Sequence, residues 1–347
     1  MSFLVYFGKR LAYAFLTLLG VLTLVFFLFQ VLPDPAQLTM GQRTDAKSIE
    51  AAREEMGLDL PVHLRYFHYL NDLSPIHFSY EDNERSSVEI KLARVYISLQ
   101  APFFRSSYQS KKPVARILGE AMEGTAVLAL TAMLIAVLFG IAAGVFSALY
   151  HGSWIDRALL AISTLGISLP SFFAAILIAW LFGYVGHAIT GLSMTGSLVD
   201  YSYDEGRHYV WKNLILPAVA LGIRPLAIIT QLTRSSMLDV LGMDYIVTAR
   251  AKGLSEGRVL WKHALPNALN PVVTSISGWF ASLLAGAFFV EYIFNWKGLG
   301  KITVEALEKA DYPVVMGSVL WVALIFICIN MGVDILYKKL DPRIQLQ

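Results

Sequence analysis

The residues whose types and spacing could perform catalysis are few, and none completes a catalytic motif. Gly298, Gly300 and Lys301 resemble the end of a phosphate-binding loop, in which backbone amides and a lysine hold a nucleotide. However, Ile302 stands where this loop needs Ser or Thr, and Asn295 stands where its first glycine belongs. The match therefore fails, and we predict no nucleotide site in this chain.

Metal chemistry is not supported by residue spacing either. His63, His68 and His77 lie five and nine residues apart, so they do not stack on one face of a helix. We therefore favour surface histidines over a metal site. The single cysteine, Cys328, lies in an apolar run, which excludes a disulfide or a cysteine metal site within one chain. We predict that the chain is not an enzyme and binds no cofactor itself.

The composition indicates a membrane protein. The 347 residues are 56% hydrophobic and 16% charged, whereas about a quarter of the residues in a soluble domain are charged. The net charge of +2, without an arginine-rich stripe, gives no support for binding nucleic acid. Membrane lipid is therefore the first partner that the sequence predicts.

Six apolar runs are each long enough to cross a bilayer, which takes about 20 residues in a helix. The first run follows Lys9 and Arg10 and is too long for the apolar part of a cleaved signal peptide. The expected spans are residues 11–32, 125–150, 158–184, 213–233, 271–290 and 312–333. We predict an all-α integral membrane protein with six transmembrane helices.

Positive residues in the short connections indicate the orientation. With six spans, four positive segments fall on one side, which we assign to the cytoplasm together with both termini. Their cations are Lys9, Arg10, Arg157, Arg234, Arg250, Lys252, Arg258, Lys262, Lys338, Lys339 and Arg343. We accordingly divide the chain into a first span (1–32), an extracytoplasmic segment (33–120), a core (121–337) with a cytoplasmic loop (239–271), and a cytoplasmic tail (338–347).

The segment 33–120 is expected to be folded. It carries eleven Lys and Arg against twelve Asp and Glu, so it is nearly neutral, and it is not of low complexity. Asp45 and Gly57 are expected to bound one helix, and Pro61 to lead a second. Residues 88–99 partly alternate between polar and apolar types, which predicts paired strands.

Arg224 lies inside the fourth apolar run, next to Pro225. A buried charge in a membrane is costly and usually faces a cavity or a partner. We favour contact with a partner subunit, or a side chain that reaches the interface from a tilted helix, over a place in the translocation pathway. Both interpretations stay open, and Gln231 and Asn330 are further pathway candidates.

The loop 239–271 is polar, basic and rich in helix boundaries. Asp244 is expected to cap a helix that Gly253 ends, and Ser255 to cap a second helix that ends before Pro266. An amphipathic helix lying on anionic lipid is the alternative. The glycine and proline positions favour a shaped element to which another protein docks.

The first of these helices is expected to present small side chains among cations. Thr248, Ala249 and Ala251 alternate with Arg250 and Lys252. Small residues let another surface come close, and flanking cations can meet carboxylates at the rim of an interface.

This loop resembles the EAA loop of ABC importer permeases. The spacing Ala249-x3-Gly253-x9-His263-Ala-Leu265-Pro266 is shared, and TARAKGLSEGRVLWKHALPNALNPVV is similar to the peptide and nickel branch of that family. Further similar stretches are MGLDLPVHLRYFHYL, LTRSSMLDVL, FNWKGLG and DPR. Val247, Thr248 and His263 depart from the general motif, as that branch commonly does. The stretch from about residue 74 to 110 contains no motif that we can assign to the family.

The resemblance implies an energy source outside this chain. It implies a second, homologous permease subunit, ATP-binding subunits that carry ATP and Mg²⁺, and an extracytoplasmic substrate-binding protein, in the inner membrane of a bacterium. Short peptides are the implied cargo, with nickel or another small solute as the alternative. An ion-coupled secondary transporter is the competing class. The implied ATPase-coupling residues are Asp244, Tyr245, Thr248, Ala249, Arg250, Ala251, Lys252, Gly253, Leu254, Arg258 and Pro266.

Overall fold

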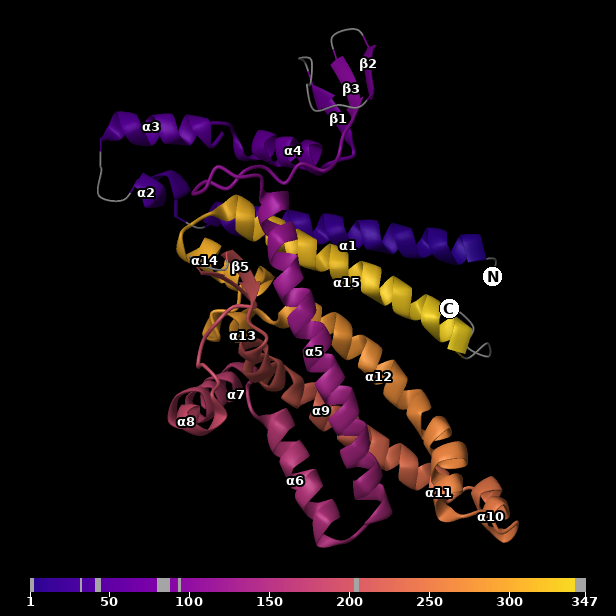
Figure 1. Ribbon diagram of the computed structural model, residues 1–347. Coiled ribbons are helices and arrows are strands. Elements are labelled where there is room, and N and C mark those ends of the chain that lie inside the picture. The colour runs from indigo at the N-terminus through magenta and orange to yellow at the C-terminus, as the bar shows by residue number, and fades with distance from the viewer. Residues whose placement is uncertain are drawn as a thin grey trace. The chain divides into compact units, whose positions relative to one another are not determined.

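The computed structural model describes residues 3–31, 33–40, 45–79, 88–92, 95–202 and 206–340 (Figure 1). These residues divide into two compact units, the first from residues 1–8, 122–301 and 325–347, the second from 9–121 and 302–324. The helices α1, α5, α14 and α15 continue from one unit into the other. The last residues of the predicted tail, 341–347, lie outside the described residues.

The second unit contains most of α1 (Phe3–Val31) and the segment that follows it. This segment forms α2 (Pro35–Met40), α3 (Ala46–Glu55), α4 (Val62–Leu73), β1 (Ile76–Ser79), β2 (Val88–Leu92) and β3 (Val95–Leu99). Asp45 precedes α3, Gly57 follows it with a φ of +64°, and Pro61 precedes α4, so the predicted helix boundaries are confirmed. The Asp45 side chain accepts no capping hydrogen bond.

The predicted strands at 88–99 are also confirmed. β3 pairs antiparallel with both β2 and β1, with Leu99 opposite Val88 on one side and Ile76 on the other. β1 is not predicted from the sequence, because its partners lie between 17 (Ser79 to Tyr96) and 23 (Ile76 to Leu99) residues away and its own four residues are too few to show a pattern. Together with a hairpin described below, this sheet corrects the all-α prediction: small antiparallel sheets accompany the helices.

The first unit contains the remaining elements. These are most of α5 (Val114–Leu149), α6 (Trp154–Ser168), α7 (Ser171–Ile178), the π-helix η1 (Ala179–Val185), α8 (His187–Thr190), β4 (Val199–Ser202), β5 (Gly206–Tyr209), α9 (Lys212–Leu241), α10 (Asp244–Ala251), α11 (Glu256–Arg258), the π-helix η2 (Val259–Ala264), α12 (Leu265–Gly286) and α13 (Phe288–Ile293). β4 and β5 form the unpredicted hairpin, with Val199 opposite Tyr209. α14 (Leu299–Glu308) and α15 (Tyr312–Leu340) are shared between the units.

Within the described residues, four helices are long and apolar enough to cross a membrane. They are Gly8–Val31, Val114–Leu149, Lys212–Leu241 and Tyr312–Val333, which confirms four of the expected spans. The expected third span is instead a pair, Trp154–Ser168 and Ser171–Val185, bent by 110°. The bend falls at Pro170, which precedes α7 with a φ of −58° and cannot donate a helical hydrogen bond. If the pair counts as one span, the structure has five.

The expected span at 271–290 corresponds to α12. This helix has 22 residues, which is long enough, but it is not among the four apolar helices. Its apolar side chains are interrupted by Asn270, Thr274, Ser275, Ser277 and Gly278. The six-span count therefore stays a prediction.

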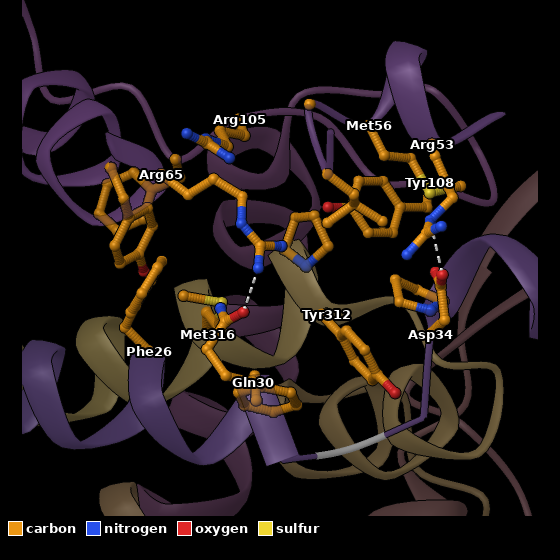
Figure 2. Close-up of a pocket in the computed structure, with 17 residues that line it drawn as sticks. Phe26, Gln30, Asp34, Arg53, Met56, Arg65, Arg105, Tyr108, Tyr312 and Met316 are labelled. Atoms are coloured by element: carbon orange, nitrogen blue, oxygen red, sulfur yellow. Dashed lines mark hydrogen bonds and ion pairs between the residues drawn. The ribbon is translucent and has the colours of Figure 1, made fainter. Parts of the chain in front are cut away.

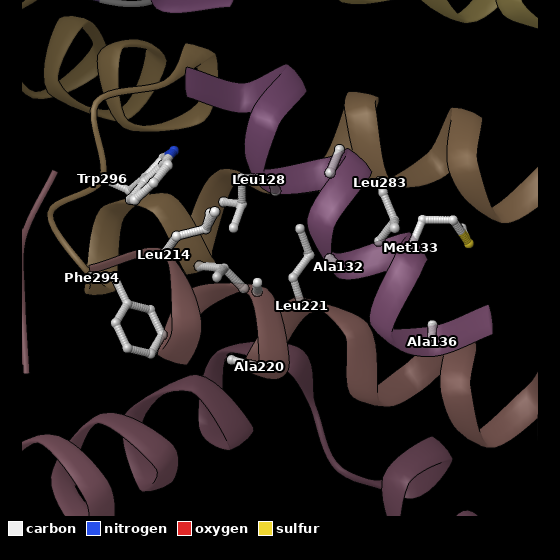
Figure 3. Close-up of a cluster of buried hydrophobic side chains, with 14 of the residues drawn as sticks. Leu128, Ala132, Met133, Ala136, Leu214, Ala220, Leu221, Leu283, Phe294 and Trp296 are labelled. Atoms are coloured by element: carbon white, nitrogen blue, oxygen red, sulfur yellow. The ribbon is translucent and has the colours of Figure 1, made fainter. Parts of the chain in front are cut away.

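The core of the first unit forms where α5, α9 and α12 pack together (Figure 3). Ala132 and Ala136 of α5 are fully buried in one cluster with Leu221 of α9 and Leu283 of α12. Gly144 continues the close contact of α5 with α9, because a Cβ there would lie 2.5 Å from Thr233 Cβ. Small residues on α5 therefore set the separation of these helices.

Candidate functional site

The loop between α9 and α12 folds as two short helices at the ends of these long ones (Figure 1). Met243 precedes α10, and Asp244 is its first helical residue, so the prediction that Asp244 is the cap is wrong by one position. Gly253 follows α10 with a φ of +77°, a conformation that favours glycine, and its amide donates to the Arg250 carbonyl (2.9 Å). Its predicted place as the helix stop is confirmed.

The second helix of the loop does not end before Pro266, and that prediction is wrong. α11 begins after Ser255, as predicted, but the chain continues through η2 directly into α12. Pro266 lies in the first turn of α12, where helices accept proline. The wider π-helical turn just before it accommodates the missing N–H.

The inner side of this loop is apolar and packs on the long helices. Ile246 and Ala249 of α10 are three residues apart and share one face, which is buried in one cluster with Met237 of α9 and Val259 of η2. Ala249 is only 7% exposed, so the prediction that it is presented to a partner is wrong. Its small side chain instead lets α10 lie close to the rest of the first unit.

The outer side of the loop carries the other predicted coupling residues. Leu254 is partly buried, and the exposed members of the predicted set are Asp244, Tyr245, Thr248, Arg250, Ala251, Lys252, Gly253, Arg258 and Pro266. Three large apolar side chains that the sequence analysis missed are exposed beside them: Met243, Val247 and Trp261. We call this exposed set, residues 243–266 without the buried positions, the loop surface.

The loop surface has the chemistry of a docking site. Exposed apolar residues rimmed by charges mark contact with a protein or a membrane. The signal for Met243 and Val247 was present in the sequence, since they lie four residues apart at one helical face. Arg250 is not a free rim cation, because its Nε lies 3.0 Å from Glu256 Oε1 across the Gly253 turn. This exposed pair orients α10 against α11 and contributes little to stability.

A buried ion pair anchors the end of α9 from which the loop departs. Arg234 Nε and Nη2 donate to Asp156 Oδ1 (2.6 Å) and Oδ2 (2.8 Å), a bidentate arrangement. Ser147 of α5 donates to the same carboxylate, and so does the Gly152 amide (2.9 Å). The pair therefore ties α9 to the α5–α6 turn.

This anchor is not predicted from the sequence, where Arg234 is interpreted only as a cytoplasmic cation. A local signal existed, because Ser153 and Asp156 have the spacing of a helix-capping pair. Ser153 does precede α6, and its Oγ accepts from the Asp156 amide (3.3 Å). That signal places Asp156 at a helix start but does not identify Arg234 as its partner.

The three pathway candidates are not joined by hydrogen bonds within the described chain. Arg224 is exposed on α9 and forms no hydrogen bond or ion pair with the residues that the structure describes. Gln231 lies two turns further along α9, on the same face. Asn330 of α15 donates to its own helix at the Phe326 carbonyl (2.7 Å).

A second buried carboxylate lies near the other end of α5. Glu291 of α13 is fully buried and accepts hydrogen bonds from Thr125 Oγ1 (2.7 Å) and from the amides of Gly300 (2.7 Å) and Lys301 (3.2 Å). Burial raises the pKa of Glu291 to about 7, although these hydrogen bonds oppose the rise. A Cβ at Gly298 would lie 2.4 Å from the carboxylate, so only glycine fits there.

Residues 294–300 wrap around this carboxylate and fix it to α5. Trp296 Nε1 donates to the Gly124 carbonyl (2.9 Å), and the Leu299 amide donates to Thr125 Oγ1 (2.8 Å). From the sequence, FNWKGLG is recognised as a motif but Glu291 is not recognised as its partner. The need for glycine at 298 and 300 arises only when the fold places the Glu291 carboxylate beside them.

Comparison with known families matches residues 140–346 to the binding-protein-dependent transport system inner membrane component. Residues 1–129 match the N-terminal part of binding-protein-dependent transport system membrane components. The glutathione transport system permease protein GsiC of Salmonella choleraesuis (strain SC-B67) is 37% identical over 338 residues, 97% of each chain. GsiC of Escherichia coli (strain K12) has the same identity and coverage.

Solved structures of similar fold include the MetNI methionine ABC transporter in inward facing conformations, whose matching chain superposes with a TM-score of 0.51 at 18% identity. The match covers 65% of this chain and 97% of that chain. At this identity the likeness concerns the fold alone.

Proposed function

The chain belongs to the family of binding-protein-dependent transport system inner membrane components, and we propose that, as an ABC importer permease subunit, it moves short peptides. It is a multi-pass protein of the inner membrane. The observation that carries the proposal is the loop surface, a separately folded helix–turn–helix held at the ends of α9 and α12. Similarity to permeases named for glutathione, a tripeptide, supports a peptide-like cargo.

The energy for transport comes from a separate ATPase subunit that docks on the loop surface. The exposed Tyr245, Val247 and Trp261 supply apolar contact area, and Lys252 and Arg258 supply charges at its rim. ATP and Mg²⁺ are held by that partner. The Asp156–Arg234 pair is the fixed point through which movement of α10 reaches α5 and α6.

This proposal places the loop surface and both chain termini in the cytoplasm. It requires six spans, with α12 and the bent pair α6–α7 each crossing the membrane. The positive residues in the short connections support this orientation. The proposed assembly contains, besides this chain and the ATPase, a homologous permease subunit that completes the pathway and a binding protein that delivers the cargo outside.

Arg224 faces this homologous subunit in the proposal. It is an exposed cation within the otherwise apolar stretch 214–229 of α9, and it has no ion-pair partner in the described part of its own chain. Contact with a carboxylate of the second subunit or of the peptide cargo removes the cost of placing it in lipid. Gln231, on the same face of α9, extends the polar contact.

Gly253→Pro tests the proposal most directly. Proline fixes φ near −65°, which is incompatible with the +77° at this position, so the turn between α10 and α11 cannot form. We expect the purified complex with its ATPase to lose peptide uptake into proteoliposomes and peptide-stimulated ATP hydrolysis, each by at least about tenfold.

Gly119→Ala is the control, because Gly119 lies in α5 outside the loop surface, a Cβ there meets no atom within 4 Å and its φ is ordinary. It should leave both activities unchanged. Intact coupling in Gly253→Pro would show that α10 is not the coupling helix. Uptake that stops when the proton gradient is removed but continues when ATP is depleted would establish an ion-coupled transporter instead. Uptake of Ni²⁺ but not of peptide would show that the substrate is nickel.

A further inference from the structure

A cavity of about 220 Å³ lies within the second unit, apart from the loop surface. The end of α1, the start of α2, the turn after α3, the inner face of α4 and the start of α15 enclose it (Figure 2). Nothing in the proposed transport cycle uses this cavity. Its lining combines cations with apolar side chains, which is the composition of a small-molecule site.

The cations of this cavity exceed the anions that neutralise them. Arg53 Nε lies 2.8 Å from Asp34 Oδ2, and Arg105 Nε lies 2.9 Å from Asp72 Oδ2. Arg65 has no carboxylate partner in the described chain, since its Nη2 donates to the neutral Gln30 at Oε1 (2.6 Å). One positive charge, that of Arg65, is therefore left uncompensated beside the cavity.

The Arg65 guanidinium also retains unused hydrogen-bonding capacity. Its Nε is buried and has no partner among the described residues. Figure 2 shows this side chain reaching into the middle of the lining residues, above Gln30. A buried cationic donor without a partner is unfavourable, and native structures usually satisfy such a group with a ligand or water.

Two tyrosines add neutral donors to the same cavity. Tyr69 and Tyr108 both line it, and neither hydroxyl forms a hydrogen bond within the described part of the chain. Burial raises the pKa of both phenols, so both stay protonated at physiological pH and can donate to an anion. The Arg105 guanidinium lies 5.6 Å from the Tyr69 ring and holds that ring from one side.

The backbone beside the cavity is also unusual. Arg105 has a φ of +62°, which is costly for a residue with a side chain. Such conformations persist where the surrounding structure enforces them, and they are frequent at ligand sites. Here the Arg105 carbonyl accepts from the Val114 amide (3.0 Å), and the side chain is directed to Asp72 and Tyr69.

We propose that this cavity binds a small organic carboxylate, which Arg65 holds through its unpaired guanidinium donors with the Tyr69 and Tyr108 hydroxyls beside it. A planar guanidinium matches a carboxylate in bidentate geometry. The remaining wall is apolar and suits a short carbon chain better than a phosphate dianion; it includes Phe26, Phe29, Leu58, Phe104 and Met316.

The volume restricts the ligand to the size of an amino acid. Pockets for larger ligands hold about 300–1,000 Å³, and this cavity is smaller. The carboxylate has two possible sources with the same chemistry: a free amino acid, or the C-terminal residue of a peptide. The inference does not depend on the ATPase coupling proposed above.

Calorimetric titration of the purified full-length chain, in complex with its partner subunits, tests this site. The probes are alanine, alanyl-alanine, alanyl-alaninamide and inorganic phosphate. We expect binding of a probe that carries a carboxylate, none of the amide, and at least tenfold weaker binding of phosphate. Binding of alanine identifies a free amino acid as the source, whereas binding of alanyl-alanine alone identifies a peptide terminus.

Arg65→Gln should weaken carboxylate binding at least tenfold, and Arg65→Lys should restore part of it. Arg116→Gln is the charge-matched control, because Arg116 is exposed in the same unit and pairs only with Glu120. If Arg65→Gln does not fold, Tyr108→Phe gives the same test with an expected loss of about threefold.

The proposal is overturned if carboxylate and amide probes bind alike, if phosphate binds as tightly as the carboxylate, or if Arg65→Gln binds like the unchanged chain. It is also overturned if Arg65→Gln weakens only the substrate-binding protein's affinity, since the cavity would then receive a protein side chain.

Discussion

Breaking the Asp156–Arg234 pair should destabilise the protein far more than a surface ion pair would. Asp156 is 2% exposed, and two Arg234 nitrogens lie 2.6 and 2.8 Å from its two oxygens. Arg234→Gln removes the positive charge and leaves a buried carboxylate uncompensated. Removal of one partner from a buried pair costs about 3–5 kcal/mol.

The lower end of this range applies here. After the substitution, Asp156 still accepts from Ser147 Oγ and from the Gly152 amide, so part of its solvation is retained. We expect a loss of about 3 kcal/mol for Arg234→Gln. Asp156→Asn should cost less, about 2 kcal/mol, because the guanidinium it leaves behind is partly exposed and can reach water.

A double-mutant cycle separates the pair from its surroundings. Arg234→Gln combined with Asp156→Asn should cost about 3 kcal/mol, so the coupling between the two positions is about 2 kcal/mol. The measurement is equilibrium unfolding of the four proteins in one detergent. Arg116→Gln, which removes an exposed i,i+4 pair, should change stability by less than about 0.5 kcal/mol.

Additive effects in that cycle would refute the reasoning, since they would mean that the two side chains do not stabilise each other. If Arg234→Gln lowered the free energy of unfolding by less than about 1 kcal/mol, the ion pair would behave like a solvent-exposed salt bridge, which would contradict its burial.

Two further predictions concern the buried carboxylate of Glu291 and the close contact of α5 with α9 at Gly144. Because the raised pKa of Glu291 makes the folded state bind its proton more tightly than the unfolded state, the contribution of Glu291 to the free energy of unfolding should be largest below about pH 4.5 and fall by about 3 kcal/mol up to pH 7. Thermal unfolding across pH 4.5–8 should show this slope relative to Glu291→Gln; parallel curves would contradict it. Gly144→Val should separate α5 from α9 and cost about 2–3 kcal/mol or more, since the space is filled by Thr233. Gly20→Val is its control, because a Cβ at Gly20 meets nothing within 4 Å, and equal losses would show that Gly144 sets no helix separation.

Local features of this fold were predictable from the sequence because they depend on neighbouring residues only. Gly57 and Gly253 both stop helices with a positive φ, and Pro61 starts one. Strand pairing at 88–99 was predictable for the same reason, since the two strands are adjacent. The family resemblance rested on such local spacing as well.

Features that depend on a distant partner were not predictable. Pro170 and Pro225 both lie in apolar runs, yet the chain bends at the first and remains helical through the second, where Pro225 is buried in α9. From the sequence Ala249 is expected to be presented to a partner, but it is buried in a cluster with residues of α9 and η2. Asp156 and Glu291 each needed partners at least 78 residues away to show that they are buried anchors rather than loop charges.

The two buried carboxylates, Glu291 and Asp156, both accept hydrogen bonds from the same helix, α5. Thr125 of α5 donates to Glu291, and Ser147 of the same helix donates to Asp156. The two hydroxyl residues are 22 positions apart, which corresponds to about 33 Å along an α-helix and is close to the thickness of a bilayer core.

Each buried carboxylate therefore fixes a different segment to α5, one at Thr125 and the other at Ser147 in its last turn. Near Thr125 the fixed segment is the 294–300 turn, and near Ser147 it is the α5–α6 turn with the end of α9. Between them, α5 packs on α9 through small residues, with Gly140 against Ile229 and Gly144 against Thr233. In the coupling proposed above, a displacement of the loop surface reaches α5 through the Asp156–Arg234 pair, and the Glu291 anchor holds the same helix at Thr125.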